Sequence, residues 1–158
     1  MNSRATVTFD ISQLEDTTKF AERLATRVSP GTCILLEGDL GSGKTHFARA
    51  LIHSKLDELG LWEDVPSPTF TLVQTYVAGD LEIWHADLYR LQSVDELEEL
   101  GLEDAFESAV TLIEWPDRLG PLVPDDALHL RFELSDDTRR LVCTGPQHLL
   151  DLLAGSTK

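Results

Sequence analysis

Apolar residues follow two different spacings along the first third of the chain, and these spacings predict strands and helices in alternation. Residues 5–11 are apolar at every second position, which is typical of a strand with one buried face. Residues 14–28 then carry apolar side chains at helical spacing, and Ser12-x-x-Glu15 resembles a capping box that would begin a helix. Residues 32–37 are almost continuously apolar, as in a strand buried on both faces of a parallel sheet.

The rest of the chain continues the alternation, with two pairs of neighbouring strands. The short connection within each pair predicts an antiparallel hairpin, the first beside the sheet and the second closing the fold. We expect, in chain order, a helix over residues 44–59 that ends near Gly60, a proline-containing loop over 62–69, strands over 71–77 and 81–86, an acidic helix that begins at Ser93-x-x-Glu96 and breaks near Gly101, a strand over 109–113, strands over 128–134 and 139–143, and a helix over 147–153.

Length and composition indicate one domain over residues 1–158. The chain has 158 residues, 42% of them apolar, and no apolar run approaches the roughly 18 residues that a membrane span needs. The first residues lack the apolar stretch of a secretory signal, and Cys33 and Cys143 stand alone. We therefore expect a soluble protein of the reducing cytoplasm that does not interact with membranes.

The charge balance limits the partners that the chain can bind on its own. Asp and Glu number 28 against 13 Lys and Arg, which gives a net charge of −15. Such a chain repels a phosphate backbone, so we do not expect strong independent binding of nucleic acid. The five histidines have no zinc-type spacing, and a metal in this protein is expected to be a hard ion on oxygen ligands.

One segment matches the phosphate-binding pattern G-x-x-x-x-G-K-[ST] and lies between a predicted buried strand and a predicted helix, as that motif requires. Its glycines allow consecutive N–H groups to converge on phosphate oxygens, which the positive end of the following helix also attracts. Lys44 is expected to neutralise the β- and γ-phosphates, and Thr45 to bind Mg²⁺. The predicted phosphate loop, and with it the predicted ATP site, consists of Gly38, Asp39, Leu40, Gly41, Ser42, Gly43, Lys44 and Thr45.

A phosphate loop of this kind also needs a carboxylate at the end of a nearby buried strand, which holds the metal directly or through water. Glu114 and Asp87 are the two candidates. Glu114 ends the more apolar strand, although an ordinary exposed acid at a strand end has the same sequence pattern. Asp87 either faces the nucleotide, or pairs with Arg90, or caps the next turn.

Residues 67–71, with the sequence SPTFT, lie where many nucleotide-binding proteins carry a segment that responds to the γ-phosphate. The alternative is a proline-rich turn that leads into a strand. His85 either positions water or has a structural role. The sole asparagine is Asn2, so the guanine-specific N-K-x-D motif is absent and ATP is favoured over GTP.

Four motifs occur in one order along the chain: the phosphate loop, SPTFTLV over residues 67–73, HADLYRL over 85–91 and EWP over 114–116. Together they closely resemble the TsaE family, also called YjeE, and the resemblance extends over nearly the whole chain. With the predicted elements, it implies a P-loop NTPase-like three-layer α/β fold. We expect a mostly parallel central sheet with antiparallel hairpin strands, and helices on both faces.

The resemblance also implies a bacterial ATPase that is needed to make threonylcarbamoyladenosine beside the anticodon of tRNA. Members of the family do not transfer the threonylcarbamoyl group. That transfer belongs to TsaD, paired with TsaB, and it uses an adenylate that TsaC makes upstream. The expected cofactors are therefore ATP and Mg²⁺, the expected partner is the TsaB–TsaD pair, and tRNA is met only through these partners, in agreement with the acidic charge.

Carried over residue by residue, the resemblance assigns the metal ligands and the catalytic set. Thr45 and Glu114 would bind Mg²⁺. Lys44 would contact the phosphates. Thr69 and Asp87 would act in catalysis or in switching, together with Lys44 and Glu114.

The resemblance bears on a few further positions with less direct roles. Arg139 would approach the nucleotide. Trp115 would either move with the nucleotide state or pack against the core. Ser42 and His46 replace residues that are common in the family, but neither change removes a ligand.

Two other functions fit the phosphate loop. A small metabolite kinase would need an acceptor pocket and a cationic lid, and the sequence has no arginine-rich lid segment. A nucleotide-gated adaptor would use ATP only to order residues 67–71 for docking. The expected mechanism differs from both, because partner docking completes the site and hydrolysis of ATP then releases the ordered state.

Overall fold

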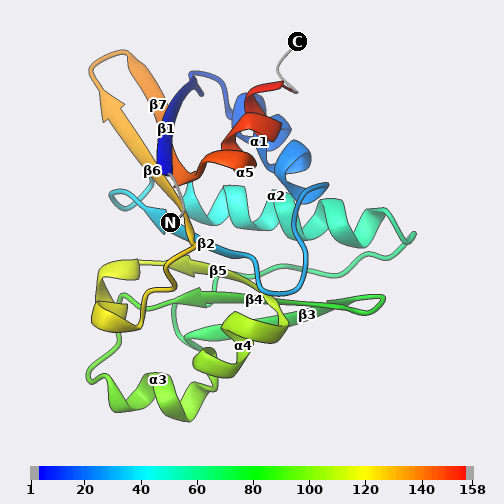
Figure 1. Cartoon of the computed structure of the whole chain (residues 1–158), viewed down its shortest axis with the longest axis vertical. Coiled ribbons are helices and arrows are strands. Elements are labelled where there is room, and N and C mark those ends of the chain that lie inside the picture. Colours follow the sequence, from blue (N-terminus) through cyan, green and yellow to red (C-terminus); the bar gives the residue numbers. More distant parts are fainter. Residues whose placement is uncertain (1–3, 156–158) are drawn as a thin grey trace.

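The apolar stretches of the sequence assemble into one seven-stranded sheet with helices packed against it (Figure 1). The computed structural model describes residues 4–155. The elements in chain order are β1 (Arg4–Asp10), α1 (Leu14–Ala25), β2 (Cys33–Glu37), α2 (Lys44–Asp57), β3 (Val73–Ala78), β4 (Leu81–Asp87), α3 (Asp95–Leu100), α4 (Leu102–Ser108), β5 (Val110–Glu114), the 3-10 segment η1 (Pro116–Leu122), β6 (Leu128–Ser135), β7 (Thr138–Pro146) and α5 (Gln147–Gly155).

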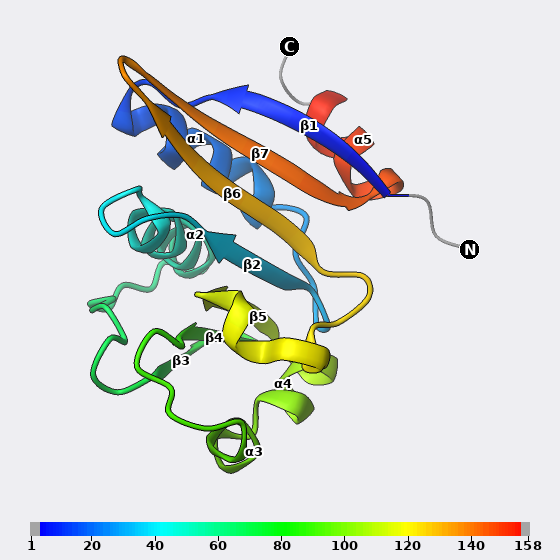
Figure 2. The same ribbon diagram turned by 90° about the vertical axis from the view of Figure 1, so that its left-hand side faces the viewer.

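The sheet has the strand order β1-β7-β6-β2-β5-β4-β3, and its twist is visible where β1, β7 and β6 run diagonally across Figure 2. β2 pairs in parallel with both β5 and β6, and β4 pairs in parallel with β5. The two hairpins, β3–β4 and β6–β7, are antiparallel, and β1 adds antiparallel to β7. The expected α/β architecture with antiparallel hairpins is thus confirmed, but only three of the six strand pairings in residues 4–155 are parallel, and the first hairpin is part of the sheet rather than beside it.

Two hydrophobic cores lie on opposite faces of the sheet. The almost continuous apolar run of β2 serves both, because Ile34 and Leu36 enter one core and Cys33 and Leu35 the other. The first core includes buried side chains of α1, α2 and α5, and the second includes those of α3 and α4. Within the described residues, no helix combines the length and the apolarity needed to cross a membrane.

Several predicted boundaries differ from the structure by one to three residues, and at two of them a local contact explains the difference. Ser12 does not cap α1, because its backbone N–H donates to Asp10 Oδ1 at 2.8 Å. The capping position is Gln13, whose N–H donates to Asp16 Oδ2 at 3.0 Å. Strand β3 begins at Val73 rather than at residue 71, because Leu72 adopts a left-handed conformation with a φ of 69° that a strand does not accommodate.

Both cysteines provide a test of the two cores. Cys33 is 2% exposed and Cys143 is fully buried, and burial raises the pKa of each thiol to about 12. Both thiols therefore stay protonated and unreactive in the native chain at pH 8. We expect Ellman's reagent to detect both thiols promptly in guanidinium chloride and neither of them promptly in native buffer. Rapid reaction of a thiol in the native chain would show that its core is open.

Candidate functional site

The loop between β2 and α2 has the backbone conformation that its glycines make possible. Gly41 and Gly43 have φ values of 79° and 112°, in the left-handed region that favours glycine. A Cβ atom at Gly38 would lie only 2.6 Å from Ser42 Oγ and 3.0 Å from the carbonyl oxygen of Phe132. The loop therefore turns tightly and leads into the N-terminus of α2, where unpaired backbone N–H groups attract anions.

Lys44 begins α2 and its side chain is held inside the site. It is 4% exposed, and its Nζ donates to the carbonyl oxygen of Gly38 at 2.5 Å and lies 3.8 Å from the centroid of the Trp115 ring. Burial lowers the pKa of Lys44, an effect opposed chiefly by the carboxylates of Glu114 and Asp87. Trp115 has a left-handed backbone with a φ of 60°, which is costly for a side chain of this size.

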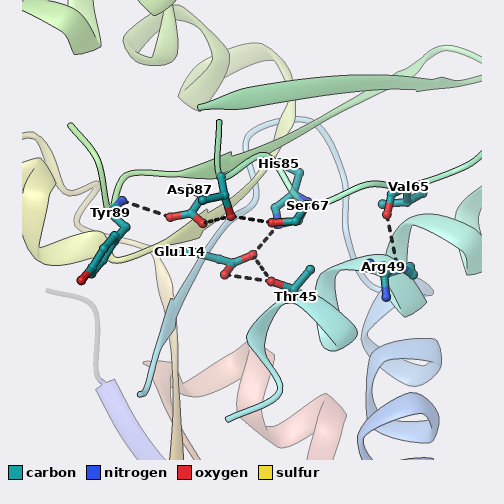
Figure 3. A network of polar contacts seen from close by, with 9 residues as sticks. Thr45, Arg49, Val65, Ser67, His85, Asp87, Tyr89 and Glu114 are labelled. Carbon is teal, nitrogen blue, oxygen red and sulfur yellow. Dashed lines mark hydrogen bonds and ion pairs between the residues drawn. The ribbon is translucent and has the colours of Figure 1, made fainter. Parts of the chain in front are cut away.

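Glu114, at the end of β5, joins α2 to β4 through its carboxylate (Figure 3). Thr45 Oγ1 donates to both carboxylate oxygens, at 3.1 Å to Oε1 and 3.0 Å to Oε2. His85 Nε2 donates to Oε2 at 2.7 Å. Glu114 is 3% exposed, so the alternative of an ordinary solvent-facing acid is wrong. His85 is fully buried behind it and does not line the cleft, which gives it a structural role rather than one in positioning water.

Asp87, at the end of β4, divides its two carboxylate oxygens between two partners (Figure 3). Oδ1 accepts from the backbone N–H of Tyr89 at 3.0 Å, and Oδ2 accepts from Thr69 Oγ1 at 3.1 Å. Ser67 Oγ lies 2.7 Å from Thr69 Oγ1, and it is the donor because the single Thr69 proton goes to Asp87. The guanidinium of Arg90 lies instead over the Phe70 ring, 4.7 Å from its centroid.

Parallel pairing brings these groups together at one edge of the sheet. Glu114 lies directly opposite Asp87 on β4 and opposite Leu36 on β2, immediately before the glycine loop. The groups surround a cleft of about 340 Å³. Its lining consists of Leu14, Leu40, Gly41, Gly43, Lys44, Thr45, His46, Thr69, Asp87, Glu114, Trp115 and Arg139.

Most of the predicted site residues therefore meet in one place, although some do not face the cleft. Ser42 is buried beneath the loop, and Gly38 and Asp39 line a neighbouring groove. Sequence reasoning did not identify Leu14 or His46 as lining residues, since neither lies in a motif that marks it. The contact of Trp115 with Lys44 was also missed.

The oxygen atoms of the site match a hard metal ion held jointly with a phosphate ligand. Among residues 4–155 there is no group of three or more His, Cys, Asp or Glu side chains that could hold a metal by themselves. Thr45 and Glu114 offer a hydroxyl and a carboxylate in direct contact, next to the loop and to Lys44. Mg²⁺ is commonly held in this way, by one or two protein oxygens together with phosphate oxygens.

Comparison with known proteins gives a consistent family. The family described as "Threonylcarbamoyl adenosine biosynthesis protein TsaE" matches residues 11–142. The tRNA threonylcarbamoyladenosine biosynthesis protein TsaE of Rickettsia bellii is 42% identical over 80% of this chain and 86% of its own length. The protein of the same name from Bacillus subtilis is 35% identical over 88% of this chain and 85% of its own length.

A solved structure agrees with the sequence comparisons. The crystal structure of YdiB from Bacillus subtilis superposes on this chain with a TM-score of 0.74 and 27% identity, and the match covers 100% of this chain and 99% of that one. The chain belongs to the TsaE family of tRNA threonylcarbamoyladenosine biosynthesis proteins, which confirms the resemblance found in its motifs.

The facing carboxylates predict a stability effect. Asp87 and Glu114 are 5% and 3% exposed on neighbouring strands, with Lys44 as the nearby cation. Asp87→Asn should therefore relieve repulsion and stabilise the ligand-free chain by about 1 kcal/mol, a rise in Tm of roughly 3 °C. Thermal unfolding with and without Asp64→Asn, an exposed control, measures the effect. A lower Tm for Asp87→Asn would mean that its two hydrogen bonds outweigh the repulsion.

Proposed function

We propose that the chain is a Mg²⁺-dependent ATPase that supports threonylcarbamoyladenosine modification of tRNA. It acts with a TsaB–TsaD pair and does not itself transfer the threonylcarbamoyl group. The observation that carries the proposal is the contact of Thr45 with Glu114 beside the buried Lys44, at the mouth of a glycine loop. Membership of the TsaE family supports the role in tRNA modification, and the geometry of the site supports the proposed hydrolysis of ATP.

The proposal includes a P-loop NTPase fold over a single domain of residues 1–158. Its support is the position of β2 in the middle of the sheet, flanked by the parallel strands β5 and β6 and followed at once by the glycine loop and α2. In open sheets of this kind, ligands bind outside the carboxyl ends of the parallel strands. The cleft lies at that edge.

The phosphates of ATP bind to the loop and to the N-terminus of α2. The backbone N–H groups of the loop donate to phosphate oxygens, and Lys44 exchanges its contact with the Gly38 carbonyl for one with the β- and γ-phosphates. Arg139, on the lining of the cleft, adds a second cation near the nucleotide. The absence of an N-K-x-D motif favours adenine as the base.

Thr45 and Glu114 are the residues that would hold Mg²⁺ in this site. The Thr45 hydroxyl contributes one oxygen, and the Glu114 carboxylate contributes another, directly or through water. When bound, the metal neutralises charge on the β- and γ-phosphate oxygens. His85 donates to Glu114 from the buried side and fixes the orientation of its carboxylate.

Asp87 and Thr69 act on the attacking water. The water oxygen forms a bond to the γ-phosphorus, and the bond between the γ-phosphorus and the β–γ bridging oxygen, which lies in line with it, breaks. ADP leaves with the bridging oxygen, and inorganic phosphate is released. The Thr69 hydroxyl orients the water, and Asp87 accepts its proton. Lys44 stabilises the charge that develops in the transition state.

Docking to TsaB–TsaD agrees with the acidic net charge of the chain. Its net charge of −15 makes direct binding of tRNA unfavourable, so the partners hold the tRNA in the cytoplasm, and TsaC supplies their substrate upstream. Docking then orders residues 67–71, whose Phe70 is 81% exposed in the free chain. A partner that completes the site explains why hydrolysis would be weak in the chain alone.

Turnover of ATP tests the proposal directly. We expect weak release of phosphate by the chain alone, a rise of about tenfold or more when TsaB–TsaD is added, and a fall below about a tenth of the wild-type rate in Lys44→Ala. A rate that ignores the partners, or that survives in Lys44→Ala, would contradict the proposal. Full modification activity with Asp87→Asn, despite blocked hydrolysis, would favour the adaptor.

The metal assignment has a separate test in His85. His85→Leu removes the donor to Glu114, whereas His85→Gln offers an amide N–H in a similar place. We expect His85→Leu to need about 10- to 100-fold more Mg²⁺ for tight nucleotide binding, with little change in affinity when EDTA is present, and His85→Gln to recover part of the loss. Isothermal titration calorimetry at several Mg²⁺ concentrations measures this. Equal losses with and without Mg²⁺ would exclude a role through the metal.

A further inference from the structure

Arg49 is a half-buried cation that donates to a backbone carbonyl. It lies on α2, and its Nε donates to the carbonyl oxygen of Val65 at 3.0 Å (Figure 3). None of the ion pairs found among residues 4–155 includes Arg49, although the chain has 28 acids. A guanidinium that is held against a carbonyl fixes the position of that carbonyl, because its donors are rigid and planar.

Val65 is the fixed point before the segment that carries Thr69. Val65 is 4% exposed, whereas Ser67, Phe70 and other residues that follow it are open to solvent. At the far end of the segment, the N–H of Leu72 donates to Pro68 O at 2.7 Å, and the Leu72 carbonyl accepts from Asp87 N at 2.8 Å. Residues 66–71 belong to no strand or helix, so these two ends determine where the Thr69 hydroxyl can lie.

The same helix holds both the metal-binding residue and the anchor of this segment. Thr45, Arg49 and His53 are spaced by four residues and so lie along one face of α2. Thr45 contacts Glu114, Arg49 contacts Val65, and His53 Nε2 donates to the carbonyl oxygen of Glu63 at 3.1 Å. A movement of α2 relative to β5 would therefore also move the loop that precedes Thr69.

The geometry points to Arg49 as a positioning residue for the reaction: by holding Val65, it fixes the near end of residues 66–71 and places the Thr69 hydroxyl opposite Asp87. Its catalytic part rests on the proposed ATPase function, because it acts through Thr69. Arg49 itself does not line the cleft, although its helix, α2, begins there. Removing Arg49 should therefore lower turnover more than nucleotide affinity.

The opposing explanation is that Arg49 only braces α2 and contributes to global stability. Matched variants separate the two. Arg49→Met keeps the apolar stem and removes the donor, and Arg49→Lys keeps a charged donor without the planar fork. Lys55→Met is the control, because Lys55 lies on the same helix and, within residues 4–155, its ion pair is with Glu58, at 3.4 Å.

Two measurements on the full chain decide between the explanations. Hydrogen exchange of the amides in residues 67–72 is compared with that in β2, and the kcat for ATP with TsaB–TsaD is compared with the Kd for Mg²⁺·ATP. For Arg49→Met we expect faster exchange in residues 67–72 alone, a loss of about 10- to 100-fold in kcat and a change within about twofold in Kd. Arg49→Lys should lie between Arg49→Met and the wild type, and Lys55→Met should match the wild type.

Several results would overturn the assignment. These are unchanged exchange in residues 67–72, exchange that rises equally in β2, parallel losses in kcat and affinity, or a wild-type kcat in Arg49→Met. If Arg49→Met does not fold, the same comparisons are made on Arg49→Lys. If the wild type shows no turnover that responds to TsaB–TsaD, the proposed ATPase function fails, and the exchange comparison still decides whether Arg49 holds the segment.

Discussion

The parallel pairing of β4, β5 and β2 brings three strand ends to one edge of the sheet, and the two acids of the site, together with Lys44 and Thr45, depend on that alignment. Asp87 and Glu114 lie opposite each other only because their strands run in the same direction in this register. A shift of one residue would turn either carboxylate toward the opposite face. The helix that follows β2 then presents Lys44 and Thr45 to the two acids, so the site is an outcome of strand register as much as of sequence motif.

The same alignment has an energetic cost that the rest of the fold must offset. Two acids and a lysine are withdrawn from water at the edge of the sheet, and each is stabilised by specific donors or acceptors. The two cores on either face of the sheet supply the apolar burial that makes such an arrangement tolerable. Buried charged groups gathered in one cleft are typical of a functional site.

The sequence predicted well the elements and the position of the glycine loop between β2 and α2, because both depend on local patterns. The continuous apolar run of β2 indicated burial on both faces, and the structure has it in both cores. The glycine spacing placed Lys44 at the start of a helix, where it lies. The motifs also selected Thr69, Asp87 and Glu114, which line one cleft although they are far apart in sequence.

What the sequence did not predict depends on contacts between distant residues. The helix cap moved from Ser12 to Gln13 because Asp10 competes for Ser12, and the pattern S-x-x-E contains no information about that acid. The burial of His85 behind Glu114 follows from the pairing of β4 with β5, which periodicity alone does not specify. Likewise, no motif marks Arg49, because its partner is a backbone carbonyl sixteen residues away and not a side chain of recognisable chemistry.

The contacts of the Lys44 ammonium group affect how tightly the proposed nucleotide would bind. The ammonium group is buried, and it contacts the carbonyl oxygen of Gly38 and the face of the Trp115 ring. If the proposed function holds, binding of a phosphate would be an exchange of partners, and its affinity would be the difference between two sets of contacts. A change to the Trp115 ring would shift that difference through Lys44 alone, so a residue that also packs against the second core and against Tyr89 would tune the affinity for the proposed nucleotide.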